Sequence, residues 1–213
     1  MPSSYDPTTA LIIVDVQNDF ADPEGGLSVC GGEDVVPLIN AEIEAARAAG
    51  ALIAATQDWH PASTPHFAQG GGTWPGHCGA GTWGAELFPG LAAGPADPRV
   101  RKGSDGEDGY SGFTMRDAAT GATTPTTLDG LLREAGVTRT RIAGLATDYC
   151  VKATALDSGA LGYRSEVLTD AIRAVELVPG DGERALDEMA AAGVTMVTTQ
   201  GTSTPGVPTE GGA

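Results

Sequence analysis

The sequence has few positively charged residues. Of its 213 residues, 12 are lysine or arginine and 28 are aspartate or glutamate, so the formal net charge is −16. A polyanion of this kind is repelled by nucleic acid and by anionic membrane surfaces. The charge therefore argues against nucleic-acid and membrane partners, and leaves small-molecule chemistry or protein partners.

Long apolar runs and paired cysteines are also missing. No run approaches the roughly 20 apolar residues that span a bilayer, and residues 1–10 lack the basic and apolar regions of a signal peptide. The three cysteines, Cys30, Cys78 and Cys150, cannot all pair within one chain. We therefore expect reduced thiols and a cytoplasmic protein, either a monomer or a homo-oligomer.

Histidine is scarce and confined to one stretch. His60, His66 and His77 are the only three histidines, and Asp58 stands two residues before the first of them. A carboxylate with several imidazoles suits Zn²⁺, Fe²⁺ or Mn²⁺. Separate histidines that are satisfied by hydrogen bonds would be the alternative, but their grouping favours a metal site. Cys78 directly follows His77 and is a competing ligand.

Short apolar segments alternate with helical patterns along the chain. The expected strands are 10–16, 51–57, 98–103, 139–147, 165–171 and 194–199, and the expected helices are 32–50, 126–136, 148–162 and 180–193. This alternation predicts an α/β fold: a three-layer α/β/α, Rossmann-like domain with a mostly parallel central sheet. We expect one domain over 1–200 and a mobile Pro/Gly-rich tail over 201–213.

Reactive residue types stand where the expected strands end. Asp15, Asp58, Lys102 and the turn 146–150 each follow or close a strand. Ligands of open α/β sheets bind beyond the carboxyl ends of the strands. We therefore expect these four places to meet at one edge of the sheet.

Cys150 lies in the first turn of an expected helix, in "GLATDYCV". A helix N-terminus can lower the pKa of a thiol, and its backbone amides can hold an oxyanion. A small buried hydrophobic residue is the alternative role. Asp15, desolvated at the end of an apolar strand, is the candidate base, because the histidines are committed elsewhere.

Lysine is rarer still, with only Lys102 and Lys152 against ten arginines. Where arginine supplies almost all positive charges, a lysine indicates a chemical role. The alternative is that it is an ordinary charged residue of the surface. At the end of a strand, the Lys102 ammonium would stabilise both a thiolate and a carboxylate.

Six motifs, in order along the chain, resemble one family. They are "LIIVDVQNDF", "DWHPASTPHF", "WPGHC", "RKG", "GYSGF" and "GLATDYCV". Together they closely resemble the nicotinamidases (pyrazinamidases) of the isochorismatase-like cysteine hydrolases, from about residue 10 to 199. The aspartate with three histidines is the most specific part of this resemblance. Residues 103–109, "GSDGEDG", carry no role from it.

The resemblance implies an isochorismatase-like fold and a role for each matching residue. It implies a catalytic triad of Asp15, Lys102 and Cys150, and one divalent metal, zinc before Fe²⁺ or Mn²⁺, on Asp58, His60, His66 and His77. It also implies a cis peptide at Leu145–Ala146, an oxyanion hole of the Ala146 and Cys150 amides, and a ring pocket walled by Phe20, Trp74 and Tyr110.

The implied activity is hydrolysis of nicotinamide to nicotinate and ammonia through a thioester, as in NAD salvage. The metal would anchor the pyridine nitrogen, and pyrazinamide would be a further candidate substrate. Two alternatives stay open. One is another amide or carbamoyl hydrolase of the same superfamily, and the other is a catalytically silent metal- or ligand-binding protein on the same fold.

Overall fold

Six parallel strands form the central sheet of the protein. In the computed structural model, which describes residues 4–201, they lie in the order β3-β2-β1-β6-β7-β8. Every neighbouring pair is parallel. Their bounds are Thr9–Val14 (β1), Leu52–Asp58 (β2), Arg99–Lys102 (β3), Arg139–Leu145 (β6), Arg164–Arg173 (β7) and Thr195–Val197 (β8).

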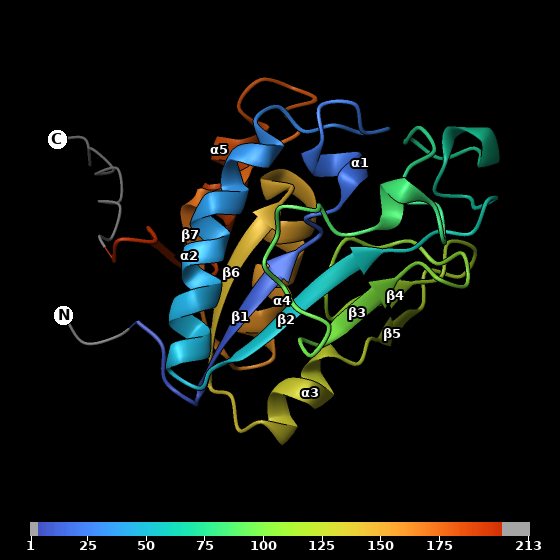
Figure 1. Ribbon diagram of the computed structural model, residues 1–213. Helices are drawn as coiled ribbons and strands as arrows, with labels where there is room; N and C mark the ends of the chain where they lie inside the picture. The colour runs from blue at the N-terminus through green and yellow to red at the C-terminus, as the bar shows by residue number, and fades with distance from the viewer. Residues whose placement is uncertain (1–3, 202–213) are drawn as a thin grey trace, which may run out of the picture.

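Helices cover both faces of this sheet. They are Asn18–Ala21 (α1), Val35–Ala48 (α2), Leu128–Glu134 (α3), Lys152–Ala160 (α4) and Asp181–Ala191 (α5). Successive side chains of a strand point to opposite faces. Leu11 and Ile13 of β1 accordingly pack in the core cluster that contains α2, whereas Ile12 packs with α3, α4 and α5. Figure 1 shows α2 in front of the sheet and α4 behind it. The predicted three-layer α/β/α fold with a parallel sheet is confirmed.

Several short elements were not predicted. They are α1, an antiparallel hairpin of β4 (Thr114–Arg116) and β5 (Thr123–Pro125), and 3-10 turns at Gly32–Asp34, Ala68–Gly70 and Trp83–Ala85. Each is at most four residues long, too short to show a periodic pattern. The expected helix 148–162 begins instead as a π-helical turn, Thr147–Val151, which leads into α4.

The structure describes residues 4–201 of the chain. The expected mobile tail, 201–213, lies outside the described residues apart from Gly201. Within residues 4–201, no helix combines the length and the apolar character that a bilayer span requires.

Four strands that are consecutive neighbours in the sheet deliver the predicted reactive residues. β3 ends at Lys102, β2 ends at Asp58, and β1 and β6 end directly before Asp15 and Ala146. Lys102 and Asp58 are also register partners. The chain runs outward from β1 to β3 on one side and from β6 to β8 on the other, so the strand order reverses beside β1. A crevice at such a switch point is the usual ligand site of an open α/β sheet.

Candidate active site

Asp15, Lys102 and Cys150 meet at the carboxyl edge of the sheet, as predicted. Lys102 Nζ donates to Asp15 Oδ2 at 2.7 Å and lies 3.4 Å from Cys150 Sγ. All three side chains are buried, and Asp15 is fully so. Asp15 has a left-handed backbone conformation, with φ of 46°. Strand β1 therefore ends at Val14, whereas the sequence predicted a strand as far as residue 16. Aspartate is among the residues that tolerate this conformation best.

The Lys102 ammonium has its three N–H groups fully used. Besides Asp15 and Cys150, Nζ donates to the Tyr110 carbonyl at 3.0 Å. Asp58 Oδ1 lies 2.9 Å from the same nitrogen as an ion pair, but no aligned hydrogen bond reaches this oxygen. Lys102 therefore supplies a positive charge that two carboxylates and a thiol share. It is buried, so the alternative of a surface lysine without a role in the site is wrong. The other lysine, Lys152, is a surface residue that pairs with Glu188.

The two carboxylates beside Lys102 differ in their proton affinity. Burial raises the pKa of Asp15 above its ordinary value, although Lys102 opposes this effect. Burial acts in the same direction on Asp58, but Lys102 and the imidazoles of His60 and His77 outweigh it, so the pKa of Asp58 lies well below its usual range. Asp58 is therefore the ionised partner, and Asp15 is the carboxylate able to accept a proton.

The pKa of the Cys150 thiol differs from the expectation of a lowered value. Burial raises it well above the ordinary value, with Lys102 opposing and Asp15 adding to the increase. The physical reason is desolvation, which outweighs one ammonium that two carboxylates already share. The thiol thus rests protonated and needs a base to ionise it.

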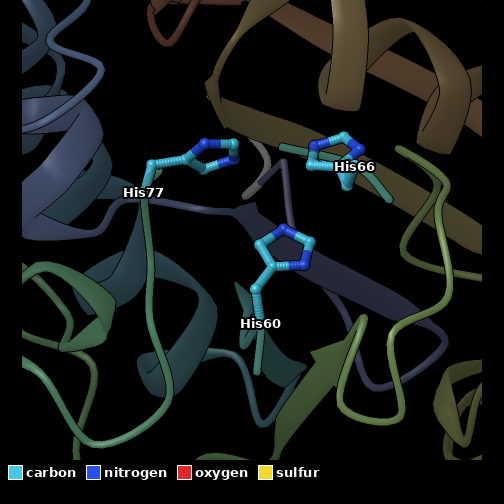
Figure 2. Close-up of side chains that lie close together, drawn as sticks. All are labelled: His60, His66 and His77. Atoms are coloured by element: carbon cyan, nitrogen blue, oxygen red, sulfur yellow. The ribbon is translucent and has the colours of Figure 1, made fainter. Parts of the chain in front are cut away.

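The three histidines converge on one space, as Figure 2 shows. Their ring centroids lie 4.8 Å (His60–His66), 5.2 Å (His60–His77) and 5.4 Å (His66–His77) apart. One nitrogen of each lies within 4.8 Å of the others, and all three residues are buried. The loop that the sequence marked as a metal site therefore gathers its imidazoles, rather than leaving them as separate hydrogen-bonded residues.

The outer nitrogen of each ring has a different neighbour. His66 Nδ1 bonds Asp108 Oδ1 at 2.7 Å, and His77 Nδ1 bonds the Pro75 carbonyl at 2.8 Å. His60 Nδ1 lies against Gly103, where an added Cβ would come within 2.6 Å of it. The Nε2 atoms are left to face the shared space.

Asp58 lies beside this cluster, within 4 Å of two of its three imidazoles. Its Oδ2 lies 3.7 Å from His60 Nε2 and 3.8 Å from His77 Nε2, too long for hydrogen bonds. Both ring nitrogens of His60 are buried and have no hydrogen-bond partner. Burial lowers the pKa of His66 and of His77, which keeps these rings neutral and able to bind a metal. A divalent cation fits this set of three imidazoles and one carboxylate. It would also give the His60 imidazole the partner that it lacks.

Cys78 is not part of this group. Its amide donates to Asp19 Oδ2 at 2.6 Å, and its thiol faces the Gly84 carbonyl at 3.8 Å. The sequence left Cys78 open as a competing ligand, but its sulfur is engaged elsewhere. The third thiol, Cys30, is exposed.

One pocket of about 340 Å³ opens onto both clusters. Cys150 lines it on the sheet side, and Asp58, His66 and His77 line it on the histidine side. The predicted walls Phe20, Trp74 and Tyr110 all line it, together with Leu27, Ala146, Tyr149 and Val175. Trp74 Nε1 donates to the Tyr110 hydroxyl at 3.0 Å. The Leu145–Ala146 peptide is cis, which confirms that expectation.

Comparison with known proteins identifies the family of this chain. The sequence matches the isochorismatase domain over residues 9–201. The chain belongs to the isochorismatase-domain family. It is 38% identical to the nicotinamidase of Escherichia coli, over 90% of this chain and 95% of that enzyme.

Solved structures agree with this family assignment. The pyrazinamidase of Pyrococcus horikoshii in complex with zinc is 39% identical, with a TM-score of 0.80 over 90% of this chain and 99% of that one. The L. infantum PnC1 protein in complex with nicotinate is 35% identical, with a TM-score of 0.80 over 91% and 94% of the two chains.

Within this isochorismatase-domain site, sequence reasoning missed two polar residues. Thr56 donates its hydroxyl to Asp15 Oδ1 at 2.6 Å, and Asp108 holds His66. Thr56 had a signal, because it is a polar residue inside the apolar strand that leads to Asp58. Asp108 had none, because its segment shows no periodic pattern and its partner lies 42 positions away.

Three further pocket residues were also missed. Leu27, Tyr149 and Val175 line the pocket but come from separate segments of the chain. Tyr149 packs its ring against Trp74 and Tyr110, with centroids 4.9 and 5.2 Å apart. The sequence gives no sign of these contacts, because Tyr149 also reads as an ordinary residue of a helical turn.

Proposed function

We propose that this protein is a nicotinamidase, a metal-containing cysteine amidohydrolase that converts nicotinamide and water to nicotinate and ammonia. One observation carries the proposal: a buried cysteine–lysine–aspartate cluster, and a cluster of three histidines with Asp58 beside it, open onto the same small pocket. The E. coli relative is a nicotinamidase, and the L. infantum structure holds nicotinate.

In the first half of the reaction, Asp15 accepts the Cys150 thiol proton, and Sγ attacks the carboxamide carbon. The raised pKa of Asp15 suits it to this step, because the thiol it must ionise is itself weakly acidic. The amides of Ala146 and Cys150 hold the oxyanion that develops, and Lys102 balances its charge. The C–N bond then breaks, ammonia leaves with the proton from Asp15, and a thioester remains.

In the second half, water attacks the thioester carbon. Asp15 takes one proton of this water, the C–S bond breaks, and that proton returns to the Cys150 sulfur as nicotinic acid leaves and releases its carboxyl proton to solvent as nicotinate. Asp15 thus carries each proton that moves to or from the Cys150 sulfur, and Lys102 and Thr56 hold its carboxylate in place. The histidines take no part in these proton transfers.

Asp58, His60, His66 and His77 would hold one divalent metal ion, with zinc as the first candidate. The relative from Pyrococcus horikoshii is described in complex with zinc. Such an ion supplies a Lewis-acidic position to which a pyridine nitrogen can bind. Phe20, Trp74 and Tyr110 would flank the ring and fix the carboxamide near Cys150.

The chemistry of the pocket favours a neutral aromatic amide. No lysine or arginine is among the described residues that line it, so it offers no cationic side chain to a substrate carboxylate. This lining favours a neutral amide such as nicotinamide over a substrate that bears a carboxylate.

We also propose a cellular setting for this reaction. We place the protein in the cytoplasm, as a single catalytic domain over 1–200 that recycles nicotinamide for NAD salvage. Its three cysteines are all free thiols, in keeping with a reducing compartment.

The test is ammonia release by the purified, zinc-loaded protein from nicotinamide, pyrazinamide, benzamide and N-carbamoylsarcosine. We expect turnover of nicotinamide, and much weaker turnover of benzamide, which lacks the ring nitrogen. Preference for the carbamoyl compound would support a different amidohydrolase. Metal binding without turnover of any of the four amides would support a silent binding protein.

A further inference from the structure

The loop 103–109 contributes one side chain to the histidine cluster. Asp108 Oδ1 lies 2.7 Å from His66 Nδ1, although it stands 42 positions away in the chain. The imidazole of His66 is almost fully buried, and the Asp108 side chain is about one quarter exposed, at 28%. A carboxylate can only accept, so the proton of this hydrogen bond belongs to His66 Nδ1.

The backbone of Asp108 is fixed on both sides. Its N–H and C=O exchange hydrogen bonds of 2.6 Å with Arg116, the last residue of β4. The Gly109 N–H donates to Asp108 Oδ1 at 2.7 Å, which locks the carboxylate in place. Arg116 also approaches Asp108 Oδ2, but at 3.8 Å and with an exposed side chain, so this ion pair adds little.

The other two imidazoles lack such a partner. His77 Nδ1 donates to the neutral Pro75 carbonyl, and His60 Nδ1 has no hydrogen-bond partner. Asp108 is therefore the only charged group among the described residues that is hydrogen-bonded to an outer ring nitrogen of the cluster.

We propose that Asp108 is a positioning residue that fixes the His66 tautomer with its proton on Nδ1 and aims the bare Nε2 at the metal. This proposal rests on the proposed function, because it takes the three histidines as metal ligands. A carboxylate on the outer nitrogen orients a ligand imidazole and increases its basicity, and loss of such a partner typically weakens metal binding by about 10–100-fold.

Two measurements on the full-length protein test this role. The first is Zn²⁺ affinity at fixed pH, by competition with a chromophoric chelator. Asp108→Ala should bind zinc about 10–100-fold more weakly than the parent. Asp108→Asn should lose less, because its amide oxygen still accepts the hydrogen bond without the charge. Asp105→Asn, an exposed aspartate of the same loop, is the matched control and should match the parent.

The second measurement is the ¹⁵N spectrum of the histidine rings in the metal-free protein at a pH where they are neutral. In the parent, His66 should carry its proton on Nδ1, and Asp108→Ala should lose this preference while His77 keeps its own. Circular dichroism establishes that each variant is folded, and Asp108→Asn provides the affinity comparison if Asp108→Ala is not.

The outcomes separate this proposal from the proposed function. Parent-like zinc affinity in Asp108→Ala, or an equal loss in Asp105→Asn, would overturn the role of Asp108 alone. An unchanged His66 tautomer in Asp108→Ala would do the same. A parent protein that binds no divalent metal would overturn both proposals, whereas a metal-binding parent that hydrolyses no amide would overturn only the proposed reaction.

Discussion

Asp58 and Lys102 link the two halves of the site. They are register partners at the ends of β2 and β3, and Asp58 Oδ1 lies 2.9 Å from Lys102 Nζ. The other oxygen of Asp58 faces the histidine cluster, at 3.7 Å from His60 Nε2. One carboxylate thus contacts both the proposed metal position and the ammonium that holds Cys150. The cysteine–lysine–aspartate cluster and the histidine cluster lie side by side because β2 and β3 end in register.

Lys102 should support both the nucleophile and the fold. Lys102→Met keeps the apolar stem but leaves two buried carboxylates without their cation, a change that costs about 3–5 kcal/mol in such settings. Because Lys102 lowers the pKa of the Cys150 thiol, its loss should raise that pKa further and slow alkylation at neutral pH. The measurement is the rate of iodoacetamide alkylation of Cys150 against pH, with kcat alongside.

Lys152→Met is the control for Lys102. This lysine forms a surface ion pair with Glu188, and its loss should stay within about 0.5 kcal/mol. Lys102→Arg should not restore turnover, because a planar guanidinium does not fit a compact site built for an ammonium. Parent-like alkylation and kcat in Lys102→Met would show that Lys102 has no part in the reaction.

Cys150→Ala should abolish ammonia release from nicotinamide but keep bound metal, because the histidine cluster does not use its sulfur. Cys150→Ser should be almost as inactive, since Asp15 is too weak a base to ionise an alcohol near neutral pH. Turnover and metal content by mass spectrometry are measured on the same samples. Cys78→Ala is the control and should retain its metal. Turnover close to the parent's in Cys150→Ala would refute the cysteine mechanism.

Gly103→Ala should disturb the histidine cluster without replacing any of its members. An added Cβ would meet His60 Nδ1 at 2.6 Å, so the ring must move, and we expect zinc affinity to fall at least about tenfold. Gly106→Ala is the control, because it shares the positive φ (87° against 75°) and hence a similar strain of about 1–2 kcal/mol. Its Cβ would meet nothing closer than Pro61 Cγ at 4.0 Å. Equal zinc affinities in the two variants would show that His60 does not need its present position.

Thr56 should set the acid limit of activity through Asp15. Its hydroxyl hydrogen bond lowers the pKa of Asp15, against the larger raising effect of burial. Thr56→Val removes this bond, so the Asp15 pKa should rise. Asp15 acts as a base only when ionised, and the acid limb of kcat/KM should therefore move to higher pH. Thr56→Ser keeps the hydroxyl and should restore the parent profile.

The pH profile of kcat/KM for nicotinamide is the measurement for this pair. Asp15→Asn provides the reference for complete loss of the base and should lower kcat by roughly 10²–10⁴-fold. If the acid limb is the same in Thr56→Val and the parent, the group that titrates there is not Asp15.

Local patterns in the sequence were enough to predict the layer order and the main reactive residues. Buried β-branched strands alternating with helices predict a parallel sheet, and this rule depends only on local periodicity. Asp15, Asp58, Lys102 and Cys150 could be named because each follows a strand, and carboxyl ends of parallel strands share one edge. The histidine cluster could be predicted because its members stand close together in the chain.

Which atoms meet in the site depends on contacts between segments that are distant in the chain. The Asp108–His66 and Thr56–Asp15 hydrogen bonds join residues 42 and 41 positions apart, and nothing in their local patterns pairs them. The direction of the Cys150 pKa was predicted wrongly for a related reason. A helix N-terminus and a nearby lysine are visible in the sequence, whereas the depth of burial and the sharing of one ammonium between two carboxylates exist only once the four strands lie side by side.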